Sequence, residues 1–506
     1  MLAQVLSAAV VGLDAVSITV EVDIFKKSLP SFSIVGLPDK AVEESKERVR
    51  SALKNSGAEF PTKKIIVNLA PADLPKIGPA YDLPIALGIL IASEQLLPPA
   101  QTALFIGELS LDGTVRHTNG VLSAALLAQK LNTDALYVPY DDASEAGLVS
   151  DIRIYPVKSL ITLNRHFSTS EKIDLFKQSP TWKHEHDPEV EIDMADISGQ
   201  EHVKRAVEIT AAGGHNIYMY GPPGSGKTMI ARALPAILPQ LTREESIEVT
   251  KIYSVTGNLP PGLSVMTNRP FRSPHHTTSR IGLIGGGTVP MPGEISLAHR
   301  GVLFLDEFPE FPRHVLEALR QPLEDGIVTI SRAKRTVTYP SKFMLVAAAN
   351  PCPCGNYGTD KDCSCLPGSI IRYQKKISGP ILDRIDLHVA VPAVKVDKLT
   401  ATAASSETSD SIRVRVQNAR NLQLARYRKL PFRANAELTT KAVKSLLPIS
   451  EQVRLILIQA VSKMGLSARA YYRVIKVART IANLENQDQI EPQHIAEALQ
   501  YRQLSG

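Results

Sequence analysis

Apolar and polar positions follow a strand-and-helix pattern through the middle of the chain. Between residues 192 and 399, short β-prone apolar runs alternate with helical patterns, as expected for a parallel sheet with crossover helices. The clearest buried strands are predicted at Asn216–Tyr220, Gly301–Leu305 and Phe343–Ala347. This part of the sequence therefore predicts an α/β core.

From residue 412 onward the pattern becomes helical. Gly465 fits the left-handed end of one helix, and Ser467 fits the N-cap of the next. Pro492 sits where the first turn of a last helix is expected. The sequence predicts an all-helical C-terminal domain.

Two polar stretches interrupt the apolar periodicity, at Ser168–Glu191 and Thr400–Ser411. They predict domains at residues 1–167, 192–399 and 412–506, joined by linkers at 168–191 and 400–411. A chain of 506 residues is too long for one hydrophobic core, which agrees with this division.

Composition changes this picture little. The chain is 44% apolar and 21% charged, and its formal charge of +6 neither requires nor excludes nucleic acid. The apolar run Leu83–Ala92 is too short to span a bilayer and predicts a core helix. Four cysteines argue against a disulfide framework. We expect a cytoplasmic protein with no membrane partner.

A glycine-rich loop follows the first predicted strand of the core and leads into a helical stretch. Its backbone N–H groups can turn toward phosphate oxygens at the helix N-terminus. The ammonium of Lys227 would reach the β- and γ-phosphates, and the hydroxyl of Thr228 would ligate Mg²⁺. A glycine-rich turn that merely matches the motif is the alternative. The sequence predicts an ATP and Mg²⁺ site formed by Gly221, Pro222, Pro223, Gly224, Ser225, Gly226, Lys227, Thr228 and Met229.

Polar residues end the next two predicted strands. Asp306 can hold Mg²⁺, and Glu307 can orient and deprotonate the attacking water. Asn350 is suited to positioning the same water, although asparagine at a strand end is usually a turn former. Because carboxyl ends of parallel strands bind ligands, these groups support the predicted ATP site.

The order of these motifs resembles the AAA+ ATPases, and within them the magnesium-chelatase-like branch. Arg272-Ser-Pro-His-His276, Pro292-Gly-Glu-Ile-Ser296 and Asn350-Pro-Cys-Pro-Cys-Gly355 resemble the bacterial ComM/YifB family most closely. The resemblance covers essentially the whole chain. It implies an AAA+ core followed by a helical lid.

The same resemblance assigns roles to three arginines. Arg384 would be an arginine finger that reaches the γ-phosphate of a neighbouring subunit. Arg469 would be the lid's sensor-2 arginine, which closes on nucleotide in cis or in trans. Arg473, one turn further along, is the second candidate in the lid. Without the family, solvated helix residues would be the default interpretation. A finger acting in trans implies an oligomer, and the family resemblance suggests a homo-hexameric ring.

Two β-prone runs, Ile327–Ser331 and Arg335–Tyr339, predict a hairpin with a basic tip. It resembles the pore hairpin of this branch, where Arg332, Lys334 and Arg335 would grip a DNA backbone. A solvated hairpin with charged edges is the alternative. Residues 270–293, with paired histidines at 275 and 276, resemble the helix-2 insert, a second pore element.

All four cysteines fall in one window, as two Cys-x-Cys pairs. Four thiolates suit a structural, tetrahedral Zn²⁺, and a reduced or redox-active loop is the alternative. The sequence predicts a zinc site at Cys352, Cys354, Cys363 and Cys365.

Residues 1–167 resemble the Lon-protease-like domain, an α/β fold of the ribosomal S5 domain 2 type that is also found in RadA/Sms recombination proteins. The nucleophile position of Lon is Ala80 here, and the lysine position is Leu122. Because a Ser–Lys dyad needs a hydroxyl and an amine, we expect no proteolysis. A ring-forming or DNA-contacting role remains.

The family resemblance implies a hexameric DNA translocase that drives branch migration, with natural transformation as its setting and recombination proteins as possible partners. A metal-chelatase motor that remodels a partner protein is the alternative, because a shared fold does not fix function.

Overall fold

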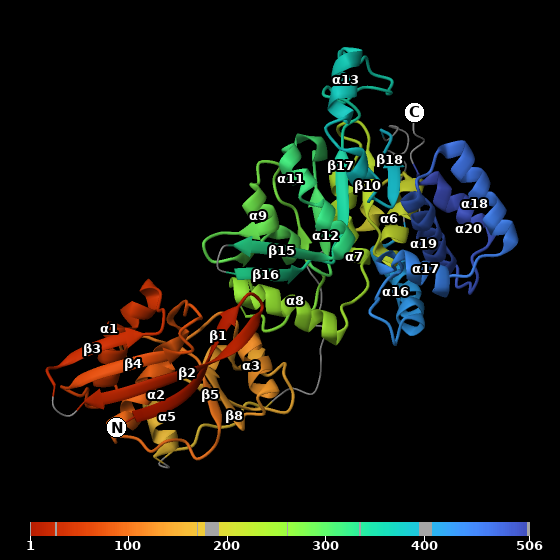
Figure 1. Cartoon of the computed structure of the whole chain (residues 1–506). Coiled ribbons are helices and arrows are strands. Elements are labelled where there is room, and N and C mark those ends of the chain that lie inside the picture. The colour runs from red at the N-terminus through yellow and green to blue at the C-terminus, as the bar shows by residue number, and fades with distance from the viewer. Residues whose placement is uncertain are drawn as a thin grey trace. The chain divides into compact units, whose positions relative to one another are not determined.

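The computed structural model describes residues 2–25, 28–168, 171–177, 192–260, 262–332, 335–393 and 407–502. The chain divides into two compact units, shown with their elements in Figure 1. Unit 1 comprises Met1–His184 and Arg243–Met266, and unit 2 comprises Glu185–Thr242 and Thr267–Gly506. None of the helices in the described ranges is long and apolar enough to cross a bilayer.

Unit 1 is built on a seven-stranded mixed sheet in the order β3-β4-β2-β1-β5-β8-β9. β2 is antiparallel to β1 and β4, and the other neighbours are parallel. Along β2, every second residue from Ile18 to Ile24 is buried, which fixes the face that carries the core. The strands are β1 (Leu2–Val11), β2 (Asp14–Phe25), β3 (Ser31–Val35), β4 (Lys64–Ala70), β5 (Ala103–Phe105), β8 (Ala135–Pro139) and β9 (Arg153–Val157), with a small ribbon of β6 (Glu108–Leu109) and β7 (Val115–Arg116).

The predicted core helix is confirmed as α2 (Asp82–Ala92), and every one of its residues is buried. Its first residue, Asp82, accepts hydrogen bonds from Arg48 Nε (2.7 Å) and from the Ser45 hydroxyl of α1. This pairing places Arg48 in the packing of unit 1. The other helices are α1 (Lys40–Asn55), α3 (Val121–Lys130), α4 (Ala143–Ala146), α5 (Leu160–Phe167) and α8 (Arg243–Thr256).

Helix α8 reaches unit 1 from a distant part of the sequence and packs on α3. Ser254 near its end donates to the carboxylate of Glu145 (2.5 Å) and accepts from the Gly120 N–H (3.1 Å). The other carboxylate contact of Glu145 is the Leu122 N–H, at 2.7 Å. Apolar contact comes from Ile247, which packs against the buried cluster around α3. The helix is therefore an integral part of unit 1.

Unit 2 contains a five-stranded parallel sheet in the order β11-β14-β17-β10-β18. The three strands predicted from the sequence are confirmed as β10 (Ile217–Tyr220), β14 (Val302–Leu305) and β17 (Met344–Ala349). β11 (Phe271–Arg272) and β18 (Leu387–Ala390) form its edges. Since all five strands run in one direction, their carboxyl ends share one edge, where the predicted site residues follow β10, β14 and β17.

Helices and short elements surround this sheet. They are α6 (Glu201–Gly213), α7 (Lys227–Ile237), α9 (Arg280–Ile284), β12 (Gly285–Gly286), β13 (Met291–Pro292), α10 (Glu294–Leu297), α11 (Arg313–Glu317), α12 (Arg320–Asp325), α13 (Pro367–Gln374) and α14 (Gly379–Leu382). The predicted hairpin is confirmed as β15 (Ile327–Arg332) and β16 (Arg335–Pro340).

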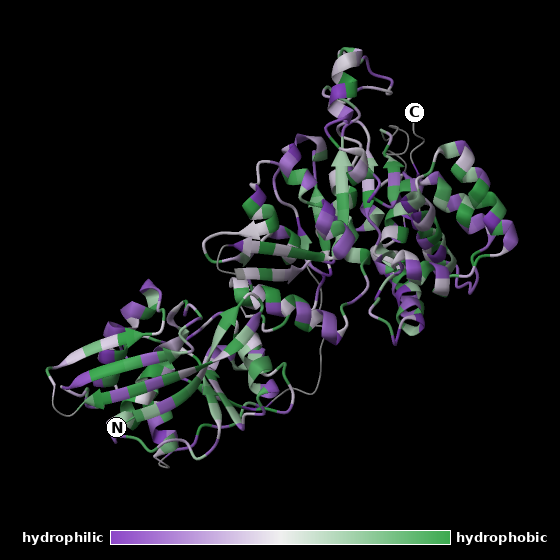
Figure 2. Cartoon of the chain, viewed as in Figure 1, coloured by the Kyte–Doolittle hydropathy of each residue, from purple (hydrophilic) through white to green (hydrophobic). Residues whose placement is uncertain are grey.

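The C-terminal helices pack on the sheet domain through a shared hydrophobic core. Val416 and Val474 of the helical region join Ile217 and Val346 of the sheet in one buried cluster. Apolar residues gather on the sheet strands in Figure 2. Ser467 caps α19, Gly465 ends α18 in the left-handed region and Pro492 opens α20, as predicted. These helices are α16 (Ser409–Arg426), α17 (Thr440–Leu446), α18 (Glu451–Met464), α19 (Ala468–Leu484) and α20 (Pro492–Gln500).

Candidate nucleotide-binding site and cysteine cluster

The glycine-rich loop joins β10 to α7, the setting that a phosphate-binding loop requires. Gly224 and Gly226 have φ values of +75° and +89°, which L side chains rarely adopt. A Cβ at Gly221 would lie 2.0 Å from the Val391 carbonyl oxygen, so the start of the loop also needs glycine. The loop backbone is thus held in a conformation that this sequence can adopt and most others cannot.

Lys227 lies at the first position of α7 with its ammonium turned back into the loop. Its Nζ donates to the carbonyl oxygens of Gly221 (2.7 Å) and Pro222 (2.8 Å) and to Asn350 Oδ1 (3.2 Å). Burial lowers the pKa of Lys227, and the charge of Asp306 opposes this shift. The structure therefore brings together Lys227 and the asparagine that ends β17.

Thr228 and Asp306 form a second contact across the same edge. The Thr228 hydroxyl donates to Asp306 Oδ2 at 2.7 Å. A threonine hydroxyl beside a carboxylate presents the oxygen ligands that Mg²⁺ prefers. The residue set fits an ATP and Mg²⁺ site in which these two residues would hold the metal and Lys227 the phosphates.

Glu307 follows Asp306 in the left-handed region, at φ +49°. Its Oε2 lies 3.0 Å from Nδ1 of His276, a residue of the segment between β11 and α9. The family resemblance places His276 in the insert and assigns it no contact with Glu307. Its contact with Glu307 joins residues 31 positions apart, which local sequence patterns do not reveal.

Two of the predicted arginines meet at one carboxylate. Arg384 binds Glu324 of α12 and donates to the Pro380 carbonyl (2.8 Å), while Arg469 of α19 lies 3.4 Å from the same Glu324. In the part of the chain that the structure describes, the side-chain hydrogen bonds of these two arginines go to Glu324 and the Pro380 carbonyl. Glu324 carries no signal in the sequence, because it lies 60 and 145 residues away from its partners.

Arg473 occupies a different place from Arg469. It pairs with the buried carboxylate of Asp386, which also accepts from the Asn216 N–H (3.0 Å). Burial alone would raise the pKa of Asp386, but the charge of Arg473 and the contact with His215 hold it far below its ordinary value. In this structure Arg473 anchors the lid to the end of β18, and its predicted role toward nucleotide stays a prediction.

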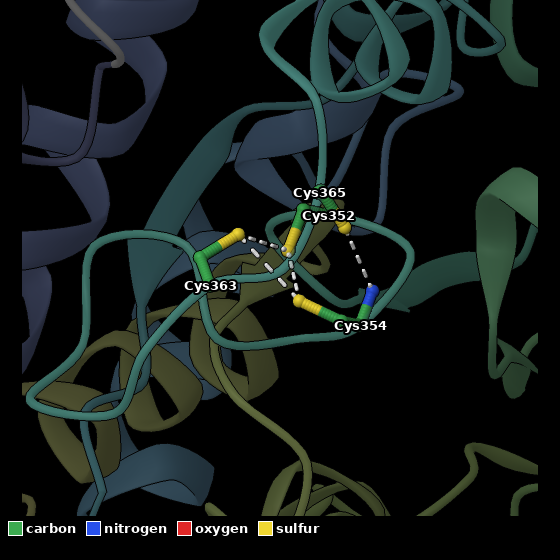
Figure 3. A group of neighbouring side chains, drawn as sticks. All are labelled: Cys352, Cys354, Cys363 and Cys365. Atoms are coloured by element: carbon green, nitrogen blue, oxygen red, sulfur yellow. Dashed lines mark hydrogen bonds between the residues drawn. The ribbon is translucent and has the colours of Figure 1, made fainter.

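The four cysteines converge, as Figure 3 shows. All four Sγ atoms lie within 4.8 Å of one another, and the Cys352–Cys354, Cys352–Cys363 and Cys354–Cys363 separations are 3.4, 3.7 and 3.5 Å. A tetrahedral Zn²⁺ with Zn–S bonds of about 2.3 Å would require separations of about 3.8 Å. The donor set therefore fits zinc, with these four residues as its ligands.

The cysteine loop lies directly on the phosphate-binding loop. A Cβ at Gly355 would sit 2.4 Å from Cδ of Pro223, and Gly355 has φ +81°. A cleft of about 720 Å³ opens beside this contact. Its lining includes Pro222, Pro223, Asn350, Asn356, Lys361 and Tyr373. A metal at the cluster would thus brace one wall of the candidate ATP site.

Two of the three predicted basic residues, Arg332 and Arg335, flank the tip of the hairpin. Arg332 ends β15 with an exposed side chain and pairs in register with Arg335, the first residue of β16. Lys334 and the side chain of Arg335 lie outside the described part of the chain. The hairpin contacts the insert, because the Tyr339 hydroxyl donates to the Pro290 carbonyl at 2.6 Å.

Comparison with known proteins identifies the family. The chain is 45% identical to competence protein ComM of Haemophilus influenzae, over 99% of this chain and 97% of ComM. It is 42% identical to the uncharacterized protein YifB of Escherichia coli K12, over 98% and 96% of the two chains. This chain belongs to the ComM/YifB family.

Four further matches place this chain among magnesium-chelatase-like AAA+ proteins. The family described as magnesium chelatase, subunit ChlI, matches residues 193–399, and its C-terminal counterpart matches 406–502. A third, described as subunit ChlI of Mg-chelatase, matches 20–142. The magnesium-chelatase 38 kDa subunit of Rhodobacter capsulatus is 27% identical over 31% of this chain and 49% of its own length. Family membership implies ATP and Mg²⁺ as ligands and indicates ATPase activity.

The two positions of unit 1 that the sequence resemblance equates with the Lon dyad hold apolar side chains. Ala80 lies in a short helical turn, Pro79–Tyr81, and Leu122 is fully buried in α3. An alanine methyl group and a buried leucine supply no nucleophile or base. The prediction that this unit does not cleave peptides rests on these two residues.

Proposed function

We propose that this chain is an ATP-driven DNA translocase that works as a homo-hexamer and moves the branch points of recombination intermediates. Full-length similarity to a competence protein carries the proposal, because competence is the capacity to take up DNA. The setting would be natural transformation in the cytoplasm, alongside recombination proteins.

ATP hydrolysis would use the residues gathered at the edge of the unit 2 sheet. Lys227 would hold the phosphates, and Thr228 and Asp306 the Mg²⁺. Glu307 would deprotonate the attacking water and Asn350 would orient it. The converging contacts of these groups support this assignment.

Two arginines would complete the site of a neighbouring subunit. Arg384 and Arg469 share Glu324, and across the described ranges their other side-chain hydrogen bond goes to the Pro380 carbonyl. A guanidinium held this way suits contact with phosphate across a subunit boundary, since it stays charged and presents a planar fork. The two arginines would leave Glu324 to bind a phosphate of the neighbouring subunit's ATP. This change of partner would couple ATP hydrolysis in one subunit to the position of the next subunit in the ring.

DNA would be gripped by the basic tip of the β15–β16 hairpin, residues Arg332, Lys334 and Arg335. Cationic side chains on a projecting hairpin can bind a phosphate backbone of any sequence. The exposure of Arg332 supports this role. Zinc at the four cysteines would stabilise the loop behind the ATP site.

A metal-chelatase-type motor that remodels a protein partner is the second candidate. It is favoured by the match of three chelatase subunit families to this chain. The similarity to ComM extends over 99% of this chain, whereas the 27% identity to a chelatase subunit covers only 31% of it. This difference favours the DNA motor.

The test is the ATPase rate of a verified hexamer with and without single-stranded or branched DNA, plus branch migration on a model junction. DNA should stimulate ATP hydrolysis, and branch migration should separate the model junction into its product duplexes. Glu307→Gln serves as the control, since it should bind ATP and DNA yet leave the junction intact. A hexamer that hydrolyses ATP but neither responds to DNA nor moves a junction would exclude this function and favour the chelatase-type motor.

A further inference from the structure

Positive charge is concentrated in one segment of the C-terminal helices, residues 411–450. This segment holds nine lysines and arginines and one acidic residue, Glu437. Its excess of positive charge is larger than the formal +6 of the whole chain. The Glu437 carboxylate accepts hydrogen bonds from Arg300 (2.9 Å) and Lys342 (3.3 Å), which lie outside the segment. The one acidic side chain is therefore paired away from the residues that carry the excess.

The first arginines of the segment are used inside the fold, on α16. Arg415 Nε donates to the carboxylate of Glu208 at 2.7 Å. Arg420 is only 6% exposed and donates to the Ala212 carbonyl at 3.2 Å. Both partners lie on α6, so these two arginines fasten α16 to the sheet domain and offer little charge to a ligand.

Cationic side chains beyond the end of α16 face solvent. Arg428 and Lys429 lie in the loop that follows α16, Lys441 lies on α17, and all three are exposed. Across the residues that the structure describes, none of these three side chains pairs with a carboxylate. α16 and α17 both pack on α19 (Figure 1). We call Arg428, Lys429 and Lys441 the lid cations.

The loop that carries Arg428 and Lys429 is fixed at both ends. At its start Tyr427 is 1% exposed, and its hydroxyl donates to Asn435 Oδ1 at 2.8 Å. At its end the Asn435 N–H donates to Gln423 Oε1 of α16, also at 2.8 Å. Because the backbone is already ordered, less conformational entropy is lost when the side chains of this loop bind an anion.

The segment offers cations without an aromatic platform. Its two aromatic residues, Tyr427 and Phe432, pack together at a ring-centroid distance of 6.3 Å against the hydrophobic core. Single strands are held by bases stacked on aromatic side chains as well as by charge, whereas a duplex presents its phosphates and keeps its bases inside. Protein partners are anchored by aromatic or apolar side chains, of which this loop turns Leu430 to solvent, at 40% exposure. The chemistry therefore matches the backbone of a nucleic-acid duplex best.

We propose that the lid cations bind the phosphate backbone of a DNA duplex, as a second DNA contact in addition to the tip of the β15–β16 hairpin. This proposal rests on the proposed function, in which branched DNA is the substrate. A branched substrate has duplex arms as well as the strands that are exchanged, so one contact holds an arm while the other grips a moving strand. Because the lid cations contact phosphates alone, binding is independent of base sequence.

The test compares the wild type with the double variant Arg428→Gln/Lys429→Gln in the full chain. Fluorescence anisotropy gives the Kd for a labelled blunt duplex and for poly-dT of equal length, from about 50 to 200 mM salt. The double variant should bind the duplex about tenfold more weakly, and the slope of log K against log salt should fall by about 2, one for each lost phosphate contact. Its affinity for poly-dT should stay within about twofold of the wild type, because the hairpin is intact.

A matched control removes two exposed lysines elsewhere, Lys130→Gln/Lys463→Gln, and should bind the duplex like the wild type. All three proteins should unfold at the same temperature, because only exposed side chains change. An unchanged duplex Kd and salt slope in Arg428→Gln/Lys429→Gln would overturn the proposal, and so would an equal loss for poly-dT. Dissociation of this variant's oligomer without DNA, seen by light scattering, would assign the surface to a second copy of the chain instead. If the variant loses duplex affinity as expected while the wild type moves no junction, the duplex contact stands and the proposed branch migration fails.

Discussion

The carboxylate of Glu145 makes the docking of α8 on unit 1 sensitive to pH. Only 4% of Glu145 is exposed, and burial raises its pKa to about 7 from an ordinary 4.5. The hydrogen bonds from Ser254 and Leu122 oppose this shift without cancelling it. Between these two pH values the folded state holds a proton that the opened state has released.

The sign and size of the effect follow from proton linkage. Because the folded state binds more protons between pH 4.5 and 7, the free energy of opening must fall as pH rises through this window. A shift of 2.5 pKa units corresponds to about 3 kcal/mol at 1.36 kcal/mol per unit. The contribution is complete below pH 4.5 and lost above pH 7.

Glu145→Gln removes the titration while keeping an oxygen for the Leu122 N–H. Hydrogen exchange of α3 and α8 amides in the full chain, corrected for intrinsic rates, should show opening free energies that fall with pH in the wild type. In Glu145→Gln the free energy of opening should not fall in this way. The plots of opening free energy against pH for the wild type and the variant should therefore diverge by about 3 kcal/mol between pH 4.5 and 7. His117, whose pKa is raised to about 9 by its hydrogen bond to Asp142, loses its own stabilisation at higher pH in both proteins.

The exposed Glu47, with 76% of its side chain accessible, provides the matched control. Glu47→Gln should leave the pH dependence of α3 and α8 unchanged. Parallel curves for the wild type and Glu145→Gln would refute the reasoning, since they would mean that Glu145 titrates alike in the folded and opened states.

Four further changes test the site and its supports. Gly355→Ala should weaken binding of a non-hydrolysable ATP analogue roughly tenfold by calorimetry, because the methyl group strains φ and meets Pro223; unchanged affinity would contradict the bracing contact. Cys363→Ser should lower both bound zinc by elemental analysis and the midpoint of thermal unfolding, and retention of stoichiometric zinc would argue against the four-cysteine site. Arg384→Ala chains should hydrolyse ATP when mixed with Lys227→Ala chains although neither does so alone; a mixture without activity would argue against action in trans. Asp386→Ala should destabilise unit 2 by about 3–5 kcal/mol in denaturant, since it strands Arg473, whereas a loss below 1 kcal/mol would show that the pair is not structural.

Local patterns in the sequence were enough to predict the sheet strands, the phosphate-binding loop and several helix ends. The loop needs glycine because of its backbone geometry at Gly224 and Gly226, and the cap at Ser467 satisfies a backbone N–H three residues on. Such features depend on neighbours in the chain, so residue type and spacing reveal them. The cysteine cluster was predictable for the same reason, since its four ligands lie within one window.

Features made by distant residues were not predictable in this way. Glu324 joins Arg384 and Arg469, and His276 joins Glu307, only after the chain has folded. Nothing in the sequence marks α8 as a part of unit 1, because its periodicity is that of any amphipathic helix. Such contacts depend on which surfaces of the folded chain meet, and residue type and spacing along one sequence do not reveal this.

The insertion of α8 into unit 1 sets an order for the synthesis of the chain. Residues up to His184 leave the ribosome before Arg243–Met266, the segment that contains α8 and completes their packing. At roughly 5–20 residues per second, the roughly 80 residues from His184 to Met266 take about 4–16 s. During that time the surface of α3 that receives Ser254 and Ile247 has no partner from its own chain. A nascent unit 1 thus exposes the surface that packs on α8 until Arg243–Met266 has been synthesised.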